Sequence, residues 1–125
     1  MPFRRGVAPI ALAVLAAVGG TLVAWHYHRL GLTLSHYDAR GHLVVARRVV
    51  DSITPGWQQI GAVWLPLPHL LNLVPVQSDV MYRTGASGVV ISVVSFAVAV
   101  GALAWIVQML SARCCRGRRG VRTQS

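Results

Sequence analysis

Two long runs of uncharged apolar residues, Val7 to Ala24 and Gly85 to Leu110, dominate the pattern along the chain. The hydrocarbon core of a bilayer is about 30 Å thick, and a helix needs roughly 20 apolar residues to cross it. The pattern therefore predicts transmembrane helices at residues 7–25 and 85–110. The fold class that it indicates is an all-α membrane protein, with both helices joined by an outer segment, residues 26–84, that carries every His and every acidic residue.

Within that outer segment, residues 35–52 have the pattern of an amphipathic helix lying at the membrane interface. Ser35 with Asp38 three residues later indicates an N-cap, because the pair is related to the capping box. We expect one apolar face and one charged stripe on this helix. The predicted apolar face is Leu43, Ala46, Val49 and Val50, and the predicted charged stripe is Arg40, Arg47 and Asp51.

The stretch from Ile60 to Val76 is apolar enough to suggest a third span, but it contains Pro66, Pro68 and Pro75. An interior proline removes a helix hydrogen bond and costs about 3 kcal/mol. A third span would also place one terminus on the outer side. The sequence favours a Pro-rich, half-embedded stretch whose backbone is satisfied by protein or water.

Charge predicts the orientation of the two spans. All twelve basic residues are Arg, and they concentrate before the first span and after the second. Arg is retained on the cytoplasmic side, so residues 1–6 and the Arg-rich tail, residues 111–125, are predicted to be cytoplasmic. A cleaved signal peptide is the alternative for the first run. The length of that run and the aromatic residues after it favour a retained anchor.

The apolar and charged content of the chain favours lipid over nucleic acid as the partner of its basic residues. Apolar residues make up 54% of the chain and charged residues only 12%, against roughly a quarter charged in soluble domains. The lipid bilayer therefore explains the basic residues better than nucleic acid, which no motif here would bind. Small residues such as Ala16 and Gly20, or Ala97 and Gly101, have the spacing at which membrane helices approach closely. They would allow packing against each other or against a membrane-helix partner.

The stretch from Tyr37 to Ser92 resembles the start of bacterial multi-span glycosyltransferases of the GT-C architecture, the protein-mannosyltransferase and aminoarabinose-transferase group. The segments WLPLPHLL and YRTG carry the resemblance most specifically. It implies an enzyme of the bacterial inner membrane that moves a sugar, with inversion, from a polyprenyl-phosphate donor to an acceptor at the outer face. Relatives have many more spans, so we expect this chain to be a truncated N-terminal fragment that is inactive alone.

The resemblance also suggests site residues. Asp38 matches an acidic residue of the first outer loop and would act as the catalytic base on an acceptor hydroxyl. Relatives often have two acidic residues there, whereas Ala39 follows here. Arg40 and Arg83 would support the carrier phosphate, and His42 lies one turn beyond Asp38. The alternatives are that Asp38 only caps its helix and that both arginines only meet lipid headgroups.

We predict no metal site, because the five His have no recognised ligand spacing. The resemblance leaves open a divalent metal as cofactor of full-length relatives. Cys114 and Cys115 are adjacent and predicted cytoplasmic, which disfavours a disulfide. The competing function is a small two-span protein that packs against a partner membrane protein. The coding sequence beyond residue 125 would separate the two hypotheses, since further spans there would favour the transferase.

Overall fold

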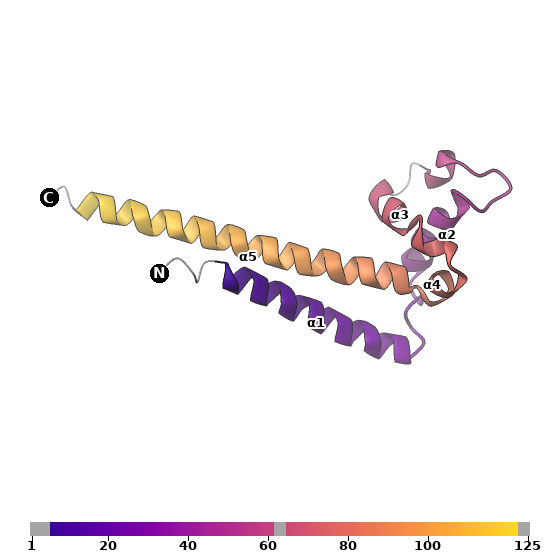
Figure 1. Cartoon of the computed structure of the whole chain (residues 1–125), viewed down its shortest axis with the longest axis horizontal. Coiled ribbons are helices and arrows are strands. Elements are labelled where there is room, and N and C mark those ends of the chain that lie inside the picture. Colours follow the sequence, from indigo (N-terminus) through magenta and orange to yellow (C-terminus); the bar gives the residue numbers. More distant parts are fainter. Residues whose placement is uncertain (1–5, 62–64, 123–125) are drawn as a thin grey trace. The chain divides into compact units, whose positions relative to one another are not determined.

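The computed structural model describes residues 6–61 and 65–122. Arg4, Arg5 and most of the predicted N-terminal segment, like the end of the tail, lie outside these residues. Every regular element within the described part is helical. The two long helices are α1, Val7–Arg29, and α5, Ala86–Arg122 (Figure 1). Contacts divide the chain into a span unit, residues 1–20 with 93–125, and a loop unit, residues 21–92.

Both long helices can cross a membrane by length and composition. The candidate spans are Val7–Arg29 and Ala86–Arg113, with 23 and 28 residues. At 1.5 Å per residue they are about 34 and 42 Å long, against a hydrocarbon core of about 30 Å. Only 6% of the most apolar window of each helix is buried in the chain itself. Such exposed apolar surface on all sides is stable in lipid, and the predicted all-α architecture with two long apolar helices that could span a membrane is confirmed.

Both helices extend beyond the predicted spans. α1 continues through Trp25 and Tyr27 to Arg29, and its last turn holds His26, His28 and Arg29. Basic groups there interact favourably with the partial negative charge at a helix C-terminus. α5 continues through the residues assigned to the tail as far as Arg122. The lack of apolar periodicity in the tail therefore did not end the helix, because Ala and Arg themselves favour helical backbone.

In the span unit, α1 and α5 pack antiparallel through small residues. A Cβ built at Gly101 would lie 3.1 Å from Cβ of Ala13, and one built at Gly20 would lie 3.9 Å from Cβ of Val93. The absence of a side chain at Gly101 is what permits this approach, as expected of small residues between membrane helices. Gly101 and Gly20 belong to the predicted small-residue pairs, so those pairs contribute to the helix contact.

The loop unit contains five further helical segments and about two turns of each long helix. In chain order they are α2, Tyr37–Arg48; η1, Trp57–Ile60; α3, Pro66–Asn72; η2, Pro75–Gln77; and α4, Asp79–Thr84. Pro66 and Pro75 each stand at the start of a short helix, where the missing N–H costs nothing. The prolines therefore divide the apolar stretch from Ile60 to Val76 into short segments, and none of the described ones is long enough to be a third span.

The interfacial helix begins and ends inside its predicted range of 35–52. The N-cap is His36, whose Nδ1 accepts a hydrogen bond from the N–H of Asp38 at 3.3 Å. Ser35 was the predicted N-cap, and that prediction is wrong. Its hydroxyl instead donates to the carbonyl of Leu32 at 2.8 Å, closing the preceding turn. The helix ends at Arg48, because the backbone turns at Val49 and Val50, and the carbonyl of Val49 accepts a hydrogen bond from the N–H of Gly56 at 2.9 Å.

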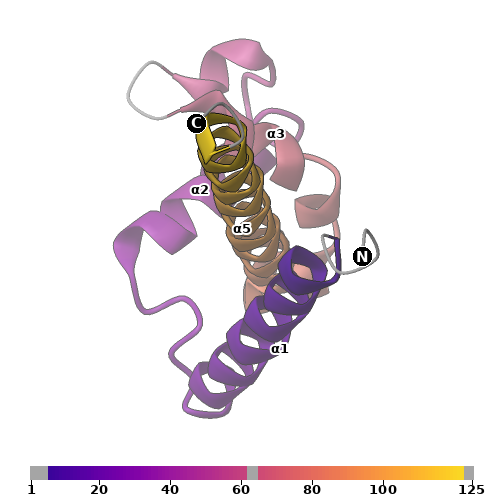
Figure 2. The same cartoon turned by 90° about the vertical axis from the view of Figure 1, so that its left-hand side faces the viewer.

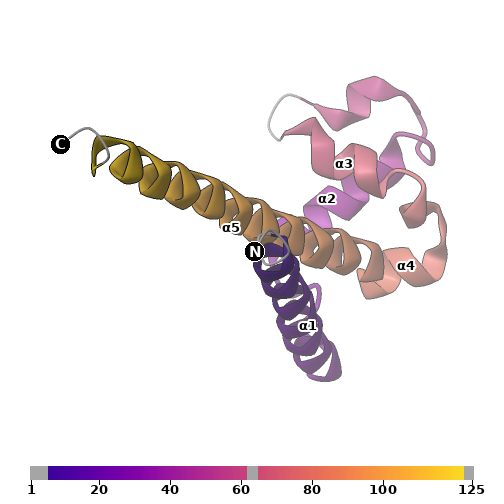
Figure 3. The same ribbon diagram turned by 60° about the vertical axis from the view of Figure 1, so that its left-hand side comes forward.

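α2 carries the small core of the loop unit. Leu43 and Ala46 are buried with Val76, and Leu34 and Tyr82 pack around them (Figure 3, where α2 and α3 are labelled). Val49 is also buried, but Val50 is 56% exposed and does not belong to the predicted apolar face. The reason is that the helix has already ended before Val50, so the helical spacing that placed it on that face no longer applies.

α4 ends at Gly85, the residue that separates the loop segment from α5. Gly85 has φ of +72°, a left-handed conformation that side-chain-bearing residues rarely adopt. A Cβ there would also lie 2.6 Å from Cδ2 of Leu34. This glycine lets the chain turn from α4 directly into the spanning helix. Figure 2 shows α5 end-on, with α2 and α3 of the loop unit labelled.

Candidate functional site

Asp38 lies in the first turn of α2, on the segment that follows the first span. Its side chain is 59% exposed, and the nearest basic group is Nδ1 of His36, at 3.8 Å from Oδ2. A carboxylate in this setting is accessible from outside the chain. Its backbone N–H, rather than its side chain, takes part in the helix cap. The alternative in which the Asp38 carboxylate serves as the cap therefore receives no support from the geometry of this turn.

His42 lies one turn beyond Asp38 and faces α3. Its ring centroid is 4.8 Å from that of His69, at an interplanar angle of 45°. The buried His69 uses Nδ1 to bond the backbone carbonyl of His42 at 3.2 Å. Burial lowers the pKa of His42, the neighbouring His69 lowers it further, and Asp38 opposes both effects. Because a buried imidazole is costly to protonate, His42 is held toward its neutral form.

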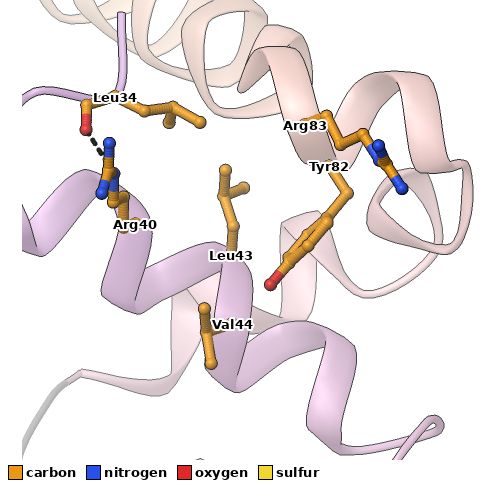
Figure 4. Close-up of a pocket in the computed structure, with 6 residues that line it drawn as sticks. All are labelled: Leu34, Arg40, Leu43, Val44, Tyr82 and Arg83. Carbon is orange, nitrogen blue, oxygen red and sulfur yellow. Dashed lines mark hydrogen bonds between the residues drawn. The ribbon is translucent and has the colours of Figure 1, made fainter.

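Arg40 and Arg83 line one pocket of the loop unit, with a volume of about 280 Å³ (Figure 4). The rest of the lining is mainly apolar and is contributed by α2, α4 and the linker before α2: Leu34, Leu43, Val44 and Tyr82. Arg40 donates from Nε to the carbonyl of Leu34 at 2.7 Å. The pocket thus has a mainly apolar lining to which two arginine side chains also contribute.

The two guanidinium groups do not converge. Figure 4 shows Arg40 turned toward Leu34, whereas Arg83 extends from α4 away from Leu43. Asp38 and His42 do not line this pocket. The four predicted site residues therefore form two groups within the loop unit, Asp38 with His42 along one side of α2 and Arg40 with Arg83 at the pocket. A ligand that met all four would have to extend from one group to the other.

Arg47, which the sequence pattern places on the charged stripe of α2 with Arg40 and Asp51, is partly covered by other residues. Its side chain is only 24% exposed, because it lies over the ring of Tyr82 with Cζ 4.6 Å from the ring centroid. Nη2 lies 2.7 Å from Oδ1 of Asp79, and Nε lies 3.2 Å from Oδ2 of Asp51. The spacing of Arg47 and Asp51 could have indicated the second pair. Nothing in the sequence indicates the first, which joins α2 to α4.

The ion pair between Arg47 and Asp79 shifts the pKa of both groups. The hydrogen bond from Arg47 lowers the pKa of Asp79, and the charge of Arg83 lowers it slightly further. In return, the two carboxylates raise the pKa of Arg47. The guanidinium of Arg47 is therefore occupied by two ion pairs within the loop unit. Arg40 and Arg83 form no ion pair with the described residues.

Polar side chains also fill the contact between α2 and α3. His69 and Asn72 are buried to 0% and 3% exposure, and Asn72 donates from Nδ2 to the carbonyl of Pro68 at 2.9 Å. In the described parts of the chain, no three His, Cys, Asp or Glu side chains gather closely enough to hold a metal ion. The histidine pair lies in this contact, since the ring centroids of His42 and His69 are 4.8 Å apart. Hydropathy along the chain does not indicate the burial of His69 and Asn72, because they are polar residues in an otherwise apolar segment.

The candidate site residues are therefore the exposed carboxylate of Asp38, the half-buried His42 and the two arginines of a mainly apolar pocket, all in the loop unit. Comparison of the chain with protein-family models, with curated proteins and with solved structures found no match.

Proposed function

We propose that this chain supplies the first two spans and the first outer loop of a polyprenyl-phosphate-sugar-dependent glycosyltransferase of a bacterial inner membrane. Both termini would be cytoplasmic and the loop unit would lie on the outer side, as the Arg distribution predicts. The observation that carries the proposal is the pocket of Arg40 and Arg83 over an apolar floor. The resemblance of residues 37–92 to the GT-C group supplies the class of reaction.

Each proposed role follows from the chemistry of the side chain. Asp38 would take the proton from an acceptor hydroxyl as its oxygen bonds to the anomeric carbon of the donor sugar. The bond from that carbon to the carrier phosphate breaks on the opposite face, so the configuration inverts. Arg40 and Arg83 would turn toward the pocket and stabilise the departing lipid phosphate through charge-assisted hydrogen bonds. His42, held toward its neutral form, could accept a hydrogen bond from a sugar hydroxyl near Asp38.

Binding of undecaprenyl phosphate tests the pocket directly. In nanodiscs of neutral lipid, we expect the chain to bind this lipid, and Arg40→Gln or Arg83→Gln to weaken binding about tenfold, as is typical for loss of one charge-assisted contact. Arg48→Gln is the matched control, because Arg48 is exposed and does not line the pocket. Equal affinity in all four proteins, or equal competition by phosphatidylglycerol, would contradict a specific phosphate site.

Activity tests Asp38. The purified 125-residue chain should transfer no sugar, because two spans cannot hold donor and acceptor together in a reactive geometry. In a version extended with the remaining spans of a GT-C enzyme, Asp38→Asn should reduce transfer by two to four powers of ten, roughly the contribution of a general base. Asp51→Asn, which removes another exposed carboxylate of the loop unit, should leave transfer nearly intact. Normal transfer by the Asp38 variant would exclude its catalytic role.

A second function rests on a different observation, an apolar groove of about 460 Å³ in the span unit. Its lining includes Ala13, Gly101, Ala102 and Trp105, so a helix with small residues could pack there. The chain would then serve as a two-span subunit of a larger membrane assembly. A photoreactive amino acid at Val98 should crosslink to another membrane protein in cells if this function is correct. Crosslinks to lipid alone would argue against it.

A further inference from the structure

α3 and the residues that flank it have reversed polarity. The side chains that face α2 are polar, since His69 and Asn72 are 0% and 3% exposed. The outward side chains are apolar and strongly exposed: Leu65 81%, Leu67 61%, Leu70 43%, Leu71 47% and Val74 78%. A helix on the surface of a water-soluble protein has the opposite arrangement. Polar groups that face the protein interior and apolar groups that face outward are characteristic of segments surrounded by lipid.

The outward face of α3 has the same surface character as the spans. Leu15 of α1 is 66% exposed and Val98 of α5 is 64% exposed, and both belong to helices that could cross a membrane. Leu67 is exposed to nearly the same fraction, 61%, and Val74 to a larger one, 78%. Such a group of large apolar side chains is costly to leave in water.

The loop unit includes parts of both helices that could cross a membrane. It contains residues 21–29, the end of one spanning helix, and residues 86–92, the beginning of the other. α3 packs on α2, and Leu43 of α2 lies within 3.8 Å of a Cβ built at Gly88 of α5. α3 is thus fixed, through α2, to a turn of α5 at the membrane surface. The nearest apolar medium for its outward face is the acyl region of the same leaflet.

The backbone of α3 also suits an apolar medium. The first four N–H groups of a helix have no partner within it. Two of the first residues of this segment are Pro66 and Pro68, which have no N–H to leave unsatisfied. At the other end, Gln77 donates from Nε2 to the carbonyl of Leu73 at 3.0 Å. Unsatisfied backbone groups are the main cost of placing a helix end in lipid, and this segment has few of them.

We infer that the face formed by Leu65, Leu67, Leu70, Leu71 and Val74 inserts into the acyl-chain region of the outer leaflet, with His69 and Asn72 turned toward α2. The inserted segment does not cross the bilayer, because α3 has only seven residues. This contact anchors the loop unit to lipid independently of the spans. It does not depend on whether the chain is part of a glycosyltransferase.

Spin labels on single cysteines test the insertion. With Cys114 and Cys115 changed to Ser, Leu71→Cys and Val74→Cys are labelled in vesicles of phosphatidylcholine and phosphatidylglycerol. We expect oxygen, which partitions into lipid, to relax both labels more than a water-soluble nickel chelate does, as at a Leu103→Cys reference in α5, where Leu103 is 63% exposed. A Gln58→Cys label, on an exposed residue of η1, should show the opposite preference.

Two results would overturn the proposal. Faster relaxation by the nickel chelate at positions 71 and 74 would place the face in water. Immobilised labels reached by neither reagent would mean that protein, such as a second copy, covers it. Leu67→Cys repeats the measurement one turn earlier, so that a label that disturbs the helix at one position does not decide the result. Circular dichroism of each labelled protein verifies that its helix content is unchanged.

Discussion

The guanidinium of Arg47 joins α2 to α4 through its 2.7 Å contact with the carboxylate of Asp79, while its face rests on the ring of Tyr82. These contacts connect a helix that follows the first span with the helix that leads into the second. The loop unit has a small apolar core. An ion pair with a stacked aromatic ring is therefore a substantial part of what holds these two helices together.

Asp79→Asn should loosen α4. We expect faster hydrogen exchange of the α4 amides in nanodiscs, with a modest effect because the carboxylate is 67% exposed and solvent screens such pairs. Asp51→Asn is the control. It removes the other carboxylate partner of Arg47, which follows α2 directly and does not contact α4 through this pair. It should leave α4 exchange unchanged. Equal effects of both substitutions would contradict the link between α2 and α4.

The ion pair between Arg47 and Asp79 predicts that α4 becomes less stable in acid. The pKa of Asp79 is lowered in the folded chain, so its contribution to stability is complete above the ordinary carboxyl value of about 4 and is lost as the pH falls further. Hydrogen exchange of α4 should therefore accelerate below about pH 4. In Asp79→Asn this acceleration should be weaker. An identical pH profile for the two proteins would mean that the pair does not stabilise the fold.

The lowered pKa of His42 predicts a second loss of stability, at a higher pH than that of Asp79. Its pKa is lowered from 6.5 by burial and by His69, so the folded state binds a proton less readily than the unfolded state. The stability of the α2–α3 contact should fall as the pH decreases through about 6.5. Hydrogen exchange of α3 measures this effect, which His42→Asn should reduce and Asp38→Asn should enlarge, since Asp38 favours the charged form. His26→Asn, at an exposed position in α1, is the control.

The contact between the spans can be tested by crosslinking. Gly20→Cys with Val93→Cys should form a disulfide when oxidised, because a Cβ at Gly20 would lie 3.9 Å from Cβ of Val93, within the range for disulfides. Gly101→Leu should strongly reduce crosslinking, since its side chain would clash with Ala13. Gly19→Leu is the control, because a Cβ there has no neighbour within 4 Å. Undiminished crosslinking with Gly101→Leu would contradict the close packing.

Orientation remains a prediction from charge. With Cys114 and Cys115 replaced by Ser, Gln58→Cys should react in intact cells with an impermeant thiol reagent, whereas Thr123→Cys should react only after the cells are opened. Thr123 lies outside the residues that the structure describes. The reverse labelling pattern would place both termini on the outer side and would also exclude the proposed outer-face reaction.

The two long apolar helices could be predicted from local sequence, because length and uniform hydrophobicity suffice to choose a helix in lipid. The sequence also indicated the helix around residues 37–48 and the interruption of the apolar stretch by prolines, since both depend on local patterns. Its errors at Ser35 and at Val50 arose at helix ends, where a competing hydrogen bond or a turn decides the boundary.

Which charged and polar residues face inward depends on how the helices pack against one another. Arg47 meets Asp79 across 32 positions of sequence, and His69 meets His42 across 27, so no local spacing could indicate either pair. The separation of Asp38 and His42 from the Arg40 and Arg83 pocket has the same cause, because the packing of α4 against α2 places Arg83. The burial of His69 and Asn72 beneath exposed leucines likewise depends on which face of α3 meets α2, and hydropathy along the chain does not contain that information.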